Sequence, residues 1–295
     1  QEKSLAIPSG QGFKTIATML YRQGLVRNET VFYLLGRITG QSTEIKAGHY
    51  MVHESWNMTE LLQHLTTGSE ALNRVQIPEG LSWWQTGMLL EDKGLVEFDE
   101  FRQLVHDRDF LEQHDIYAPT AEGFLFPETY HLSPTKDVGA ERILDILISQ
   151  FWDSTGQLWG AMEFEEIYQA VNLASLIEKE TALPEERKTI SGVFHNRLDK
   201  KMLLQCDPTI IYGLGLKFDG NLRRTHLQDW DNPYNTYRHR GFPPTPICSP
   251  GLASLEAALN PEEHDYLYFV SRNDGSHHFS RNLSQHNRAV RKFQK

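Results

Sequence analysis

The sequence has very little cysteine and no long apolar run. Its 295 residues include only two cysteines, Cys206 and Cys248, and no Cys-x-x-Cys pair. A disulfide framework and a structural zinc site are therefore not supported, and the sequence leaves open whether the two cysteines pair. No apolar run approaches the roughly 20 residues that a membrane-spanning helix needs, so we expect no such helix in these residues.

Positive charge and metal-ligand patterns are also scarce. Lysine and arginine total 29 against 39 aspartates and glutamates, which gives a net charge of −10. A nucleic-acid partner is therefore not expected, because it usually needs a clustered basic surface. The 13 histidines place no His-x-x-x-His pair on a predicted helix, and no Gly-x-Ser-x-Gly elbow occurs. These absences argue against a metal site, a metallopeptidase and a serine hydrolase, and we expect no cofactor.

The most informative stretch spans residues 170–215. Apolar residues recur at helical spacing from Ile167 to Thr181, and they cover so much of the helix that we expect it to be buried. Glu178 and Glu180 lie on opposite margins of this apolar stripe, each about 80° from its centre at about 100° per residue. A carboxyl group at such a margin loses hydration and must be paired, protonated or used in chemistry. The helical geometry alone does not choose between the two acids.

A second helix is predicted behind the first, starting at Pro184, whose fixed φ suits a first helical turn. Arg187 is its best candidate to pair with a neighbouring acid. Residues 202–204 are strand-like, and Asp207 is predicted as the N-cap of a short helix with Pro208 at its first position. Further helices are expected at residues 98–111, 140–152 and 252–259, and a loop at residues 157–165.

The segments on either side carry weaker signals. Ile7-Pro8-Ser9-Gly10 recurs as Ile77-Pro78-Glu79-Gly80, and each copy predicts a strand, a turn and a helix, the second near residues 74–96. Residues 231–251 are rich in turn formers and aromatic hydroxyls, as in the rigid loops of a saccharide groove, with structural turns as the alternative. The adjacent His277 and His278 are interpreted as polar site-lining or surface groups that point opposite ways on a strand.

A series of motifs occurs in order between residues 123 and 287: GFLFPETY, ASLIEKET, ERKTISGVFHNRL, LLQCDPTIIYGLG, YNTYRHRGFPPTPICSPGLASLEAAL, YLYFVSRNDGSHHFS and HN. This series resembles the YceG-like endolytic murein transglycosylases. Residues 1–71 resemble the LysM-like domain that precedes the catalytic part in that family. The resemblance covers nearly the whole chain, apart from the family's N-terminal membrane anchor.

The resemblance implies an α+β fold with two domains. A LysM-like module would occupy residues 1–71, and a YceG-like catalytic domain with a central helix pair and short sheets around a groove would occupy residues 72–295. The protein would act on nascent peptidoglycan strands at the periplasmic face of the bacterial inner membrane, held there by a single N-terminal anchor. Peptidoglycan synthases would be its neighbours and partners.

The resemblance also assigns residues. Glu180, the second glutamate of Glu178-Lys179-Glu180, matches the catalytic acid, and Cys206 stands where the family pattern leads us to expect a small polar residue. The other matched positions would bind substrate: Glu178, Gln205, Asp207, Tyr234, Asn235, Thr236 and Tyr237.

The implied reaction is lytic cleavage of the β-1,4 bond between N-acetylmuramic acid and N-acetylglucosamine inside glycan strands, which limits their length. Glu180 would protonate the leaving oxygen and then, as carboxylate, take the proton of the muramyl 6-hydroxyl as a 1,6-anhydro end forms. Two alternatives remain. One is a muramidase that uses water, with Asp207 or Glu178 as base, and the other is a non-catalytic peptidoglycan-binding protein.

Overall fold

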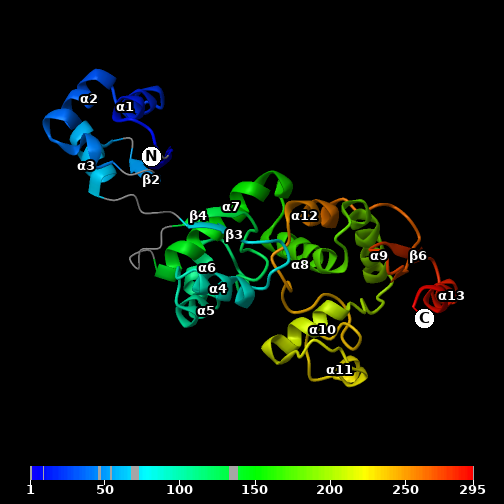
Figure 1. Cartoon of the computed structure of the whole chain (residues 1–295). Coiled ribbons are helices and arrows are strands. Elements are labelled where there is room, and N and C mark those ends of the chain that lie inside the picture. Colours follow the sequence, from blue (N-terminus) through cyan, green and yellow to red (C-terminus); the bar gives the residue numbers. More distant parts are fainter. Residues whose placement is uncertain are drawn as a thin grey trace. The chain divides into compact units, whose positions relative to one another are not determined.

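The computed structural model describes residues 2–8, 10–45, 48–53, 55–67, 73–132 and 139–294. These residues form helices and three two-stranded sheets, which confirms the predicted α+β class (Figure 1). The chain forms two compact units. The first contains Gln1–Val75, Lys93–Leu95 and Thr129–Gly139, and the second contains the remainder.

The first unit is built on two antiparallel strands, β1 (Glu2–Ile7) and β2 (Gly48–His53), in which Leu5 lies opposite Tyr50. Its helices are α1 (Phe13–Arg22), α2 (Glu29–Ile38) and α3 (Met58–Thr67), with a 3-10 turn η1 (Gln41–Thr43). The side chain of Asn28 caps α2, because its oxygen accepts hydrogen bonds from two backbone N–H groups of the first turn. Leu5 and Tyr50 are buried against apolar faces of all three helices, so this unit has its own hydrophobic core.

A second pair of strands, β3 (Asn73–Gln76) and β4 (Thr129–Leu132), joins segments that lie far apart in the sequence. The chain continues from β3 into α4 (Trp83–Asp92), just as it continues from β1 into α1. Gly24 and Gly94, which follow the two helices, have φ angles of +75° and +68°. Glycine adopts this left-handed conformation without steric cost, so it ends both helices.

The second unit is mainly helical. Its remaining elements, in chain order, are α5 (Phe98–Val105), α6 (Arg108–Gln113), α7 (Gly139–Trp159), α8 (Phe164–Glu180), η3 (Pro184–Glu186), α9 (Arg187–Asp199), α10 (Asp207–Leu214), η4 (Gly215–Lys217), α11 (Arg224–Gln228), α12 (Leu252–Leu259), β5 (Tyr268–Ser271), β6 (His277–Ser280) and α13 (Leu283–Phe293).

Two predictions in this unit were wrong in their limits. Residues 98–111 form two helices rather than one, because the carboxylate of Asp107 accepts a hydrogen bond from the N–H of Phe110 and starts α6. Helix α7 continues to Trp159, into the segment predicted as a loop. The Trp159 ring is buried, and its indole N–H donates to the hydroxyl of Thr155 one turn earlier, which stabilises the longer helix.

Helix α8 is the centre of the second unit. It packs against α9 and α12, which also contact each other (Figure 1). Every residue from position 171 to position 177 is buried, which confirms the prediction of a buried helix. The helix begins with a capping box, in which Glu163 and Glu166 each satisfy a backbone N–H of the other. Its other end carries Glu178 and Glu180 to the margin of the core.

Strands β5 and β6 form an antiparallel hairpin in which Phe269 lies opposite Phe279. Helix α13 packs on this hairpin and is capped by Asn282, whose side chain accepts a hydrogen bond from the N–H of Gln285. His277 and the adjacent His278 therefore lie on a strand, as predicted, and project to opposite faces of it.

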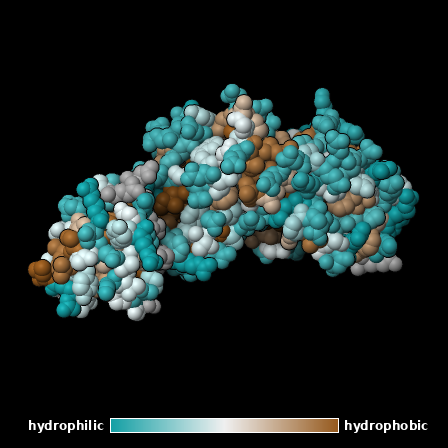
Figure 2. Space-filling model, turned by 90° about the horizontal axis from the view of Figure 1, so that it is seen from above, coloured by the Kyte–Doolittle hydropathy of each residue, from teal (hydrophilic) through white to brown (hydrophobic). Residues whose placement is uncertain are grey.

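The surface agrees with the composition. On the face drawn in Figure 2, hydrophilic residues predominate and hydrophobic residues gather in separate patches, as a mean hydropathy of −0.49 leads us to expect. Within the described ranges, no helix combines the length and the apolar character needed to cross a membrane.

Candidate functional site

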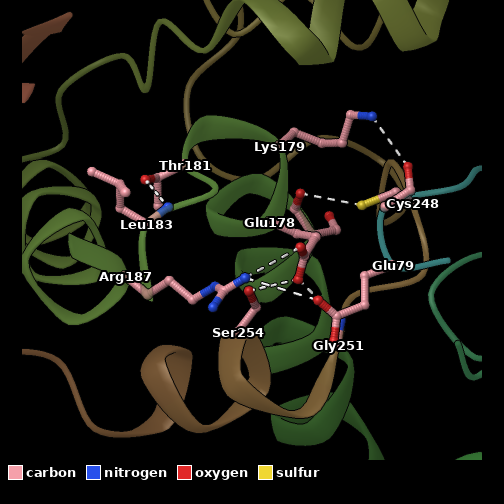
Figure 3. Close-up of polar contacts among 11 residues, drawn as sticks. Glu79, Glu178, Lys179, Thr181, Leu183, Arg187, Cys248, Gly251 and Ser254 are labelled. Atoms are coloured by element: carbon pink, nitrogen blue, oxygen red, sulfur yellow. Dashed lines mark hydrogen bonds and ion pairs between the residues drawn. The ribbon is translucent and has the colours of Figure 1, made fainter. Parts of the chain in front are cut away.

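Glu178 is bound to the start of α12 (Figure 3). Its Oε2 atom accepts hydrogen bonds from the backbone N–H of Gly251, at 3.1 Å, and from the hydroxyl of Ser254, at 2.7 Å. Its Oε1 atom lies 3.7 Å from Nη2 of Arg187, which also lies 3.8 Å from Oε2 of Glu79. The Glu178 side chain is only 8% exposed. Its negative charge is therefore used inside the protein, against the positive end of a helix and a buried arginine.

The pairing of Arg187 with a neighbouring acid, predicted from the sequence, is confirmed by this contact. Glu79 completes the cluster from the loop before α4. Burial raises the pKa of Glu79, the nearby charge of Glu178 raises it further, and Arg187 lowers it. Two carboxylates thus share one buried guanidinium. This arrangement connects α8, α9 and α12 with the loop that precedes α4.

Glu180 has a different environment, although it lies only two residues beyond Glu178. It is the last residue of α8, and the chain leaves the helix at Thr181 in an extended conformation. Glu180 is partly exposed as a residue, but protein atoms surround its carboxyl group. Burial of this group raises its pKa and is the largest of the effects on it. A hydrogen bond from the thiol of Cys206 opposes this shift, as do the charges of His277 and Arg197. Glu180 is therefore a carboxyl group held toward its protonated form.

The turn that carries Cys206 is held by Arg197 from α9. The guanidinium of Arg197 donates hydrogen bonds to the carbonyl groups of Leu203, at 3.2 Å, and Leu204, at 2.6 Å. The strand predicted at residues 202–204 is wrong for this reason: those carbonyls bind a side chain instead of a neighbouring strand. Burial lowers the pKa of Arg197, and the positive charge of Arg197 lowers the pKa of Glu180.

The backbone of Gln205 is strained at the same turn. Its φ angle of +52° is uncommon for a residue other than glycine, and its side chain is exposed. Thr236 holds the turn from the opposite side: its carbonyl accepts from the N–H of Gln205, and its hydroxyl accepts from the N–H of Cys206 at 2.9 Å. Thr236 is 2% exposed. Its contacts fix the position of the Cys206 thiol beside Glu180.

Asp207 is the first residue of α10, and Cys206 occupies the N-cap position predicted for Asp207. The helix begins one residue earlier than predicted because the carbonyl of Cys206 already accepts the N–H of Thr209. The Asp207 side chain is exposed and accepts a hydrogen bond from the hydroxyl of Tyr237 at 2.7 Å. Burial and this bond both raise the pKa of Tyr237, so its hydroxyl stays a hydrogen-bond donor.

Tyr234 and Asn235 organise the loop before Thr236. The amide of Asn235 is fully buried and donates to the backbone carbonyls of His226 and Asp229. The hydroxyl of Tyr234 lies 3.0 Å from that of Thr245. The predicted residues thus fall into two groups. Exposed or half-exposed side chains are those of Gln205, Asp207, Tyr234 and Tyr237, while Asn235 and Thr236 are buried supports.

Sequence reasoning missed Glu122, which is fully buried. Its carboxyl oxygens accept the N–H of Trp83 at 3.1 Å, at the start of α4, and the hydroxyl of Tyr212 also bonds to it. Burial raises its pKa to about 8. The sequence pattern that could have indicated a buried carboxyl group was a single acid close to the apolar run at positions 124–126.

Sequence reasoning also missed the contact between Glu186 and His277. The Nδ1 atom of His277 lies 2.6 Å from Oε2 of Glu186, and the backbone N–H of His277 donates to Oε1 at 2.8 Å. Both side chains are 12% exposed. No sequence pattern links these residues, since 91 positions separate them.

Both cysteines are free thiols, and both are buried. Burial raises the pKa of each thiol well above its usual range. Among the described residues, no group of three or more histidine, cysteine, aspartate or glutamate side chains is placed to hold a metal ion. A surface cavity of about 560 Å³ lies between the β5–β6 hairpin and α13, and Glu180 is not among the residues that line it.

The structure is that of an α+β protein in which an acid at the end of a buried helix, Glu180, is held toward its protonated form. The chain belongs to the YceG-like family, whose model matches residues 5–292. A crystal structure of a yceG-like protein from Listeria monocytogenes has a TM-score of 0.67 to this chain, at 29% identity over 97% of this chain and 98% of that one.

Two curated relatives carry the name endolytic murein transglycosylase. The protein from Bacillus subtilis (strain 168) is 30% identical over 307 residues, which cover 98% of this chain and 84% of the relative. The protein from Streptococcus pneumoniae serotype 2 is 29% identical over 320 residues. That match covers 97% of this chain and 57% of the pneumococcal protein, so this chain spans little more than half of it.

Proposed function

We propose that this protein is an endolytic murein transglycosylase. It would cleave the β-1,4 bond between N-acetylmuramic acid and N-acetylglucosamine inside nascent glycan strands and so limit their length. The observation that carries the proposal is the environment of Glu180, a carboxyl group at the end of a buried helix whose pKa is raised by burial. The names of the relatives from Bacillus subtilis and Streptococcus pneumoniae support the same activity.

The proposed chemistry begins with proton transfer. Protonated Glu180 donates its proton to the leaving oxygen as positive charge develops at the muramyl anomeric carbon. Glu180, now a carboxylate, takes the proton of the muramyl 6-hydroxyl as that oxygen bonds to the anomeric carbon, which yields a 1,6-anhydro end without water and returns Glu180 to its protonated form. Glu178 is not available as a second catalytic carboxylate, since it is bound to Arg187, Gly251 and Ser254. A mechanism with one acid and an internal nucleophile fits this arrangement.

Substrate binding is proposed for the other residues that the resemblance to the family assigns. Gln205, Asp207, Tyr234 and Tyr237 have side chains that solvent reaches, so they can meet sugar hydroxyls directly. Asn235 and Thr236 would act by holding the loop and the turn in place. Glu178 would act by fixing α12 next to the end of α8.

The first unit is proposed as a LysM-like module within residues 1–71, followed by the catalytic domain. The order strand, helix, helix, strand in β1, α1, α2 and β2, with the two strands antiparallel, supports this assignment. We further propose that the protein acts at the periplasmic face of the bacterial inner membrane through an N-terminal anchor, next to peptidoglycan synthases. A wall substrate fits that location.

The thiol of Cys206 gives a test of the role of Glu180. Because its hydrogen bond favours the ionised carboxylate, Cys206→Ala is expected to raise the pKa of Glu180. An acid that must be protonated then stays active to higher pH, so the basic limb of the kcat/KM profile should move to higher pH. Cys248→Ala, the other buried thiol, is the matched control and should leave the limb in place. A basic limb unchanged in Cys206→Ala would contradict the assignment.

The proposed function is tested by the length of purified, uncrosslinked glycan strands after incubation with the protein. Endolytic cleavage predicts that long strands disappear into fragments of intermediate length from the start of the reaction. Release of only one or two disaccharides at a time would indicate an exolytic enzyme. Strands that bind the protein and keep their length would favour the alternative of a peptidoglycan-binding protein.

A further inference from the structure

The surface cavity between the β5–β6 hairpin and α13 is not used by the proposed chemistry. It lies near the C-terminal end of the chain, where α13 follows β6 (Figure 1). Its volume of about 560 Å³ is within the range of small-ligand sites, about 300–1,000 Å³. The side-chain amide of Asn273, in the hairpin turn, donates a hydrogen bond to the carbonyl of Phe293 at 2.5 Å. The two walls of the cavity are therefore fixed to each other.

Three cationic side chains line this cavity, those of Arg272, Arg288 and Lys292. Two of them approach the same ring: Cζ of Arg272 lies 5.9 Å, and Nζ of Lys292 lies 4.9 Å, from the centre of the Phe293 ring. Arg288 donates a hydrogen bond to the hydroxyl of Ser284. Among the described residues, no carboxylate forms an ion pair with any of the three cations. They repel one another, and a bound anion would relieve that repulsion.

The charge of this region is opposite to that of the whole chain, which has a net charge of −10. From residue 271 to residue 294 the only acidic residue is Asp274, whereas the basic residues are Arg272, Arg281, Arg288, Arg291 and Lys292. The carboxylate of Asp274 accepts hydrogen bonds from the N–H and the hydroxyl of Ser276, at 2.9 and 2.7 Å, within the hairpin turn. None of the described residues that line the cavity is acidic. This region therefore attracts an acidic ligand to an otherwise acidic protein.

A buried hydroxyl group lies in the wall of the cavity. Ser280 lines the cavity and is 2% exposed, and its Oγ atom has no hydrogen-bond partner among the described residues. Ser280 and His278 lie two positions apart on β6, so their side chains share one face of the strand. That face is turned toward α13, because the His278 ring lies 5.7 Å from the Phe293 ring. A ligand oxygen in the cavity would satisfy this hydroxyl, which is costly to leave unpaired.

We propose that this cavity binds the carboxylate groups of the peptides that muramic acid carries in peptidoglycan. The inference rests on the proposed function, in which peptidoglycan strands are the substrate. Two guanidinium groups suit carboxylates, because each can form paired hydrogen bonds with one. The rings of Phe279 and Phe293 in the same walls suit the methyl groups of alanine in such peptides. Because a strand carries a peptide on every second sugar, the cavity does not have to adjoin the bond that Glu180 cleaves.

The test is the binding of a fluorescently labelled peptide, L-alanyl-γ-D-glutamyl-L-lysyl-D-alanine, to the full chain. Fluorescence anisotropy is measured at about 0.15 M salt, which screens exposed charges outside the site. The same peptide with both carboxylates converted to amides is the control probe and should bind wild type much more weakly. We expect Arg272→Gln and Arg288→Gln each to weaken binding of the acidic peptide by about tenfold. Arg291→Gln, an exposed arginine of α13 that does not line the cavity, is the matched control and should bind as wild type does.

Equal affinity for the acidic and the amidated peptide, or binding of the acidic peptide that is unchanged in both Arg272→Gln and Arg288→Gln, overturns the proposal. Binding to vesicles of anionic phospholipid that both variants lose, with no binding of the peptide, also overturns it and assigns the cavity to a lipid phosphate. Cleavage of uncrosslinked strands is measured separately. A wild type that cleaves strands without binding the peptide rejects only the peptide site, whereas one that binds the peptide and leaves strands intact rejects the proposed function.

Discussion

Replacing Glu180 with glutamine is expected to lower the rate of glycan cleavage by about 10²- to 10⁴-fold, the usual contribution of a general acid. Glutamine has nearly the same size and can still bond to the Cys206 thiol, but it has no proton to give. The loss should appear in kcat with little change in KM, because the sugar contacts proposed for Gln205, Asp207 and Tyr237 stay in place. Initial rates on uncrosslinked glycan strands measure both quantities.

The matched control is Glu185→Gln, the same chemical change at an exposed position of η3. It should keep the wild-type rate, and all three proteins should unfold at similar temperatures. A Glu180→Gln protein that folds normally and cleaves at more than a tenth of the wild-type rate would remove Glu180 from the mechanism.

Glu122 predicts an unusual dependence of stability on pH. Its pKa in the folded protein is about 8, raised from an ordinary value of 4.5, so the folded state holds a proton that the unfolded state has released between these values. The contribution of Glu122 to the free energy of unfolding is complete below about pH 4.5 and is lost as the pH rises through about 8. Over that range the free energy of unfolding should fall by roughly 3 to 5 kcal/mol.

The variant Glu122→Gln keeps an oxygen that can accept the N–H of Trp83 but has no proton to lose. Its free energy of unfolding should match that of wild type near pH 5 and exceed it at pH 9. Urea unfolding followed by tryptophan fluorescence at several pH values measures the difference. Glu100→Gln, at an exposed position of α5, is the control and should follow wild type. If the free energy of unfolding changed with pH by the same amount in wild type and in Glu122→Gln, the raised pKa of Glu122 would be contradicted.

The helices were predictable where the pattern of apolar residues was strong. The buried surface of α8 and the whole of α12 follow from apolar periodicity, which depends only on neighbours along the chain. The pairing of Arg187 followed from charge at a buried helix margin. By contrast, residues 202–204 resembled a strand because nothing local shows that Arg197 takes their carbonyl groups.

The chemistry around Glu180 was less predictable than the helix that carries it. Two acids on one helix end looked equivalent on a helical wheel, and only distant contacts separate them: Glu178 meets Ser254, whereas Glu180 meets Cys206. The strained backbone of Gln205 and the link between Glu186 and His277 also depend on partners that lie 31 and 91 positions away. Such contacts follow from the tertiary fold, and no local pattern encodes them.

Mass spectrometry of the strand ends produced from uncrosslinked glycan by wild type and by Glu180→Gln tests the proposed reaction and its acid together. With Glu180 as the acid of a lytic mechanism, we expect internal fragments that end in 1,6-anhydromuramic acid from wild type and none from the variant. Reducing ends from wild type would contradict the lytic mechanism and indicate a muramidase that uses water. The same anhydro ends from both proteins would contradict the assignment of Glu180 as the acid.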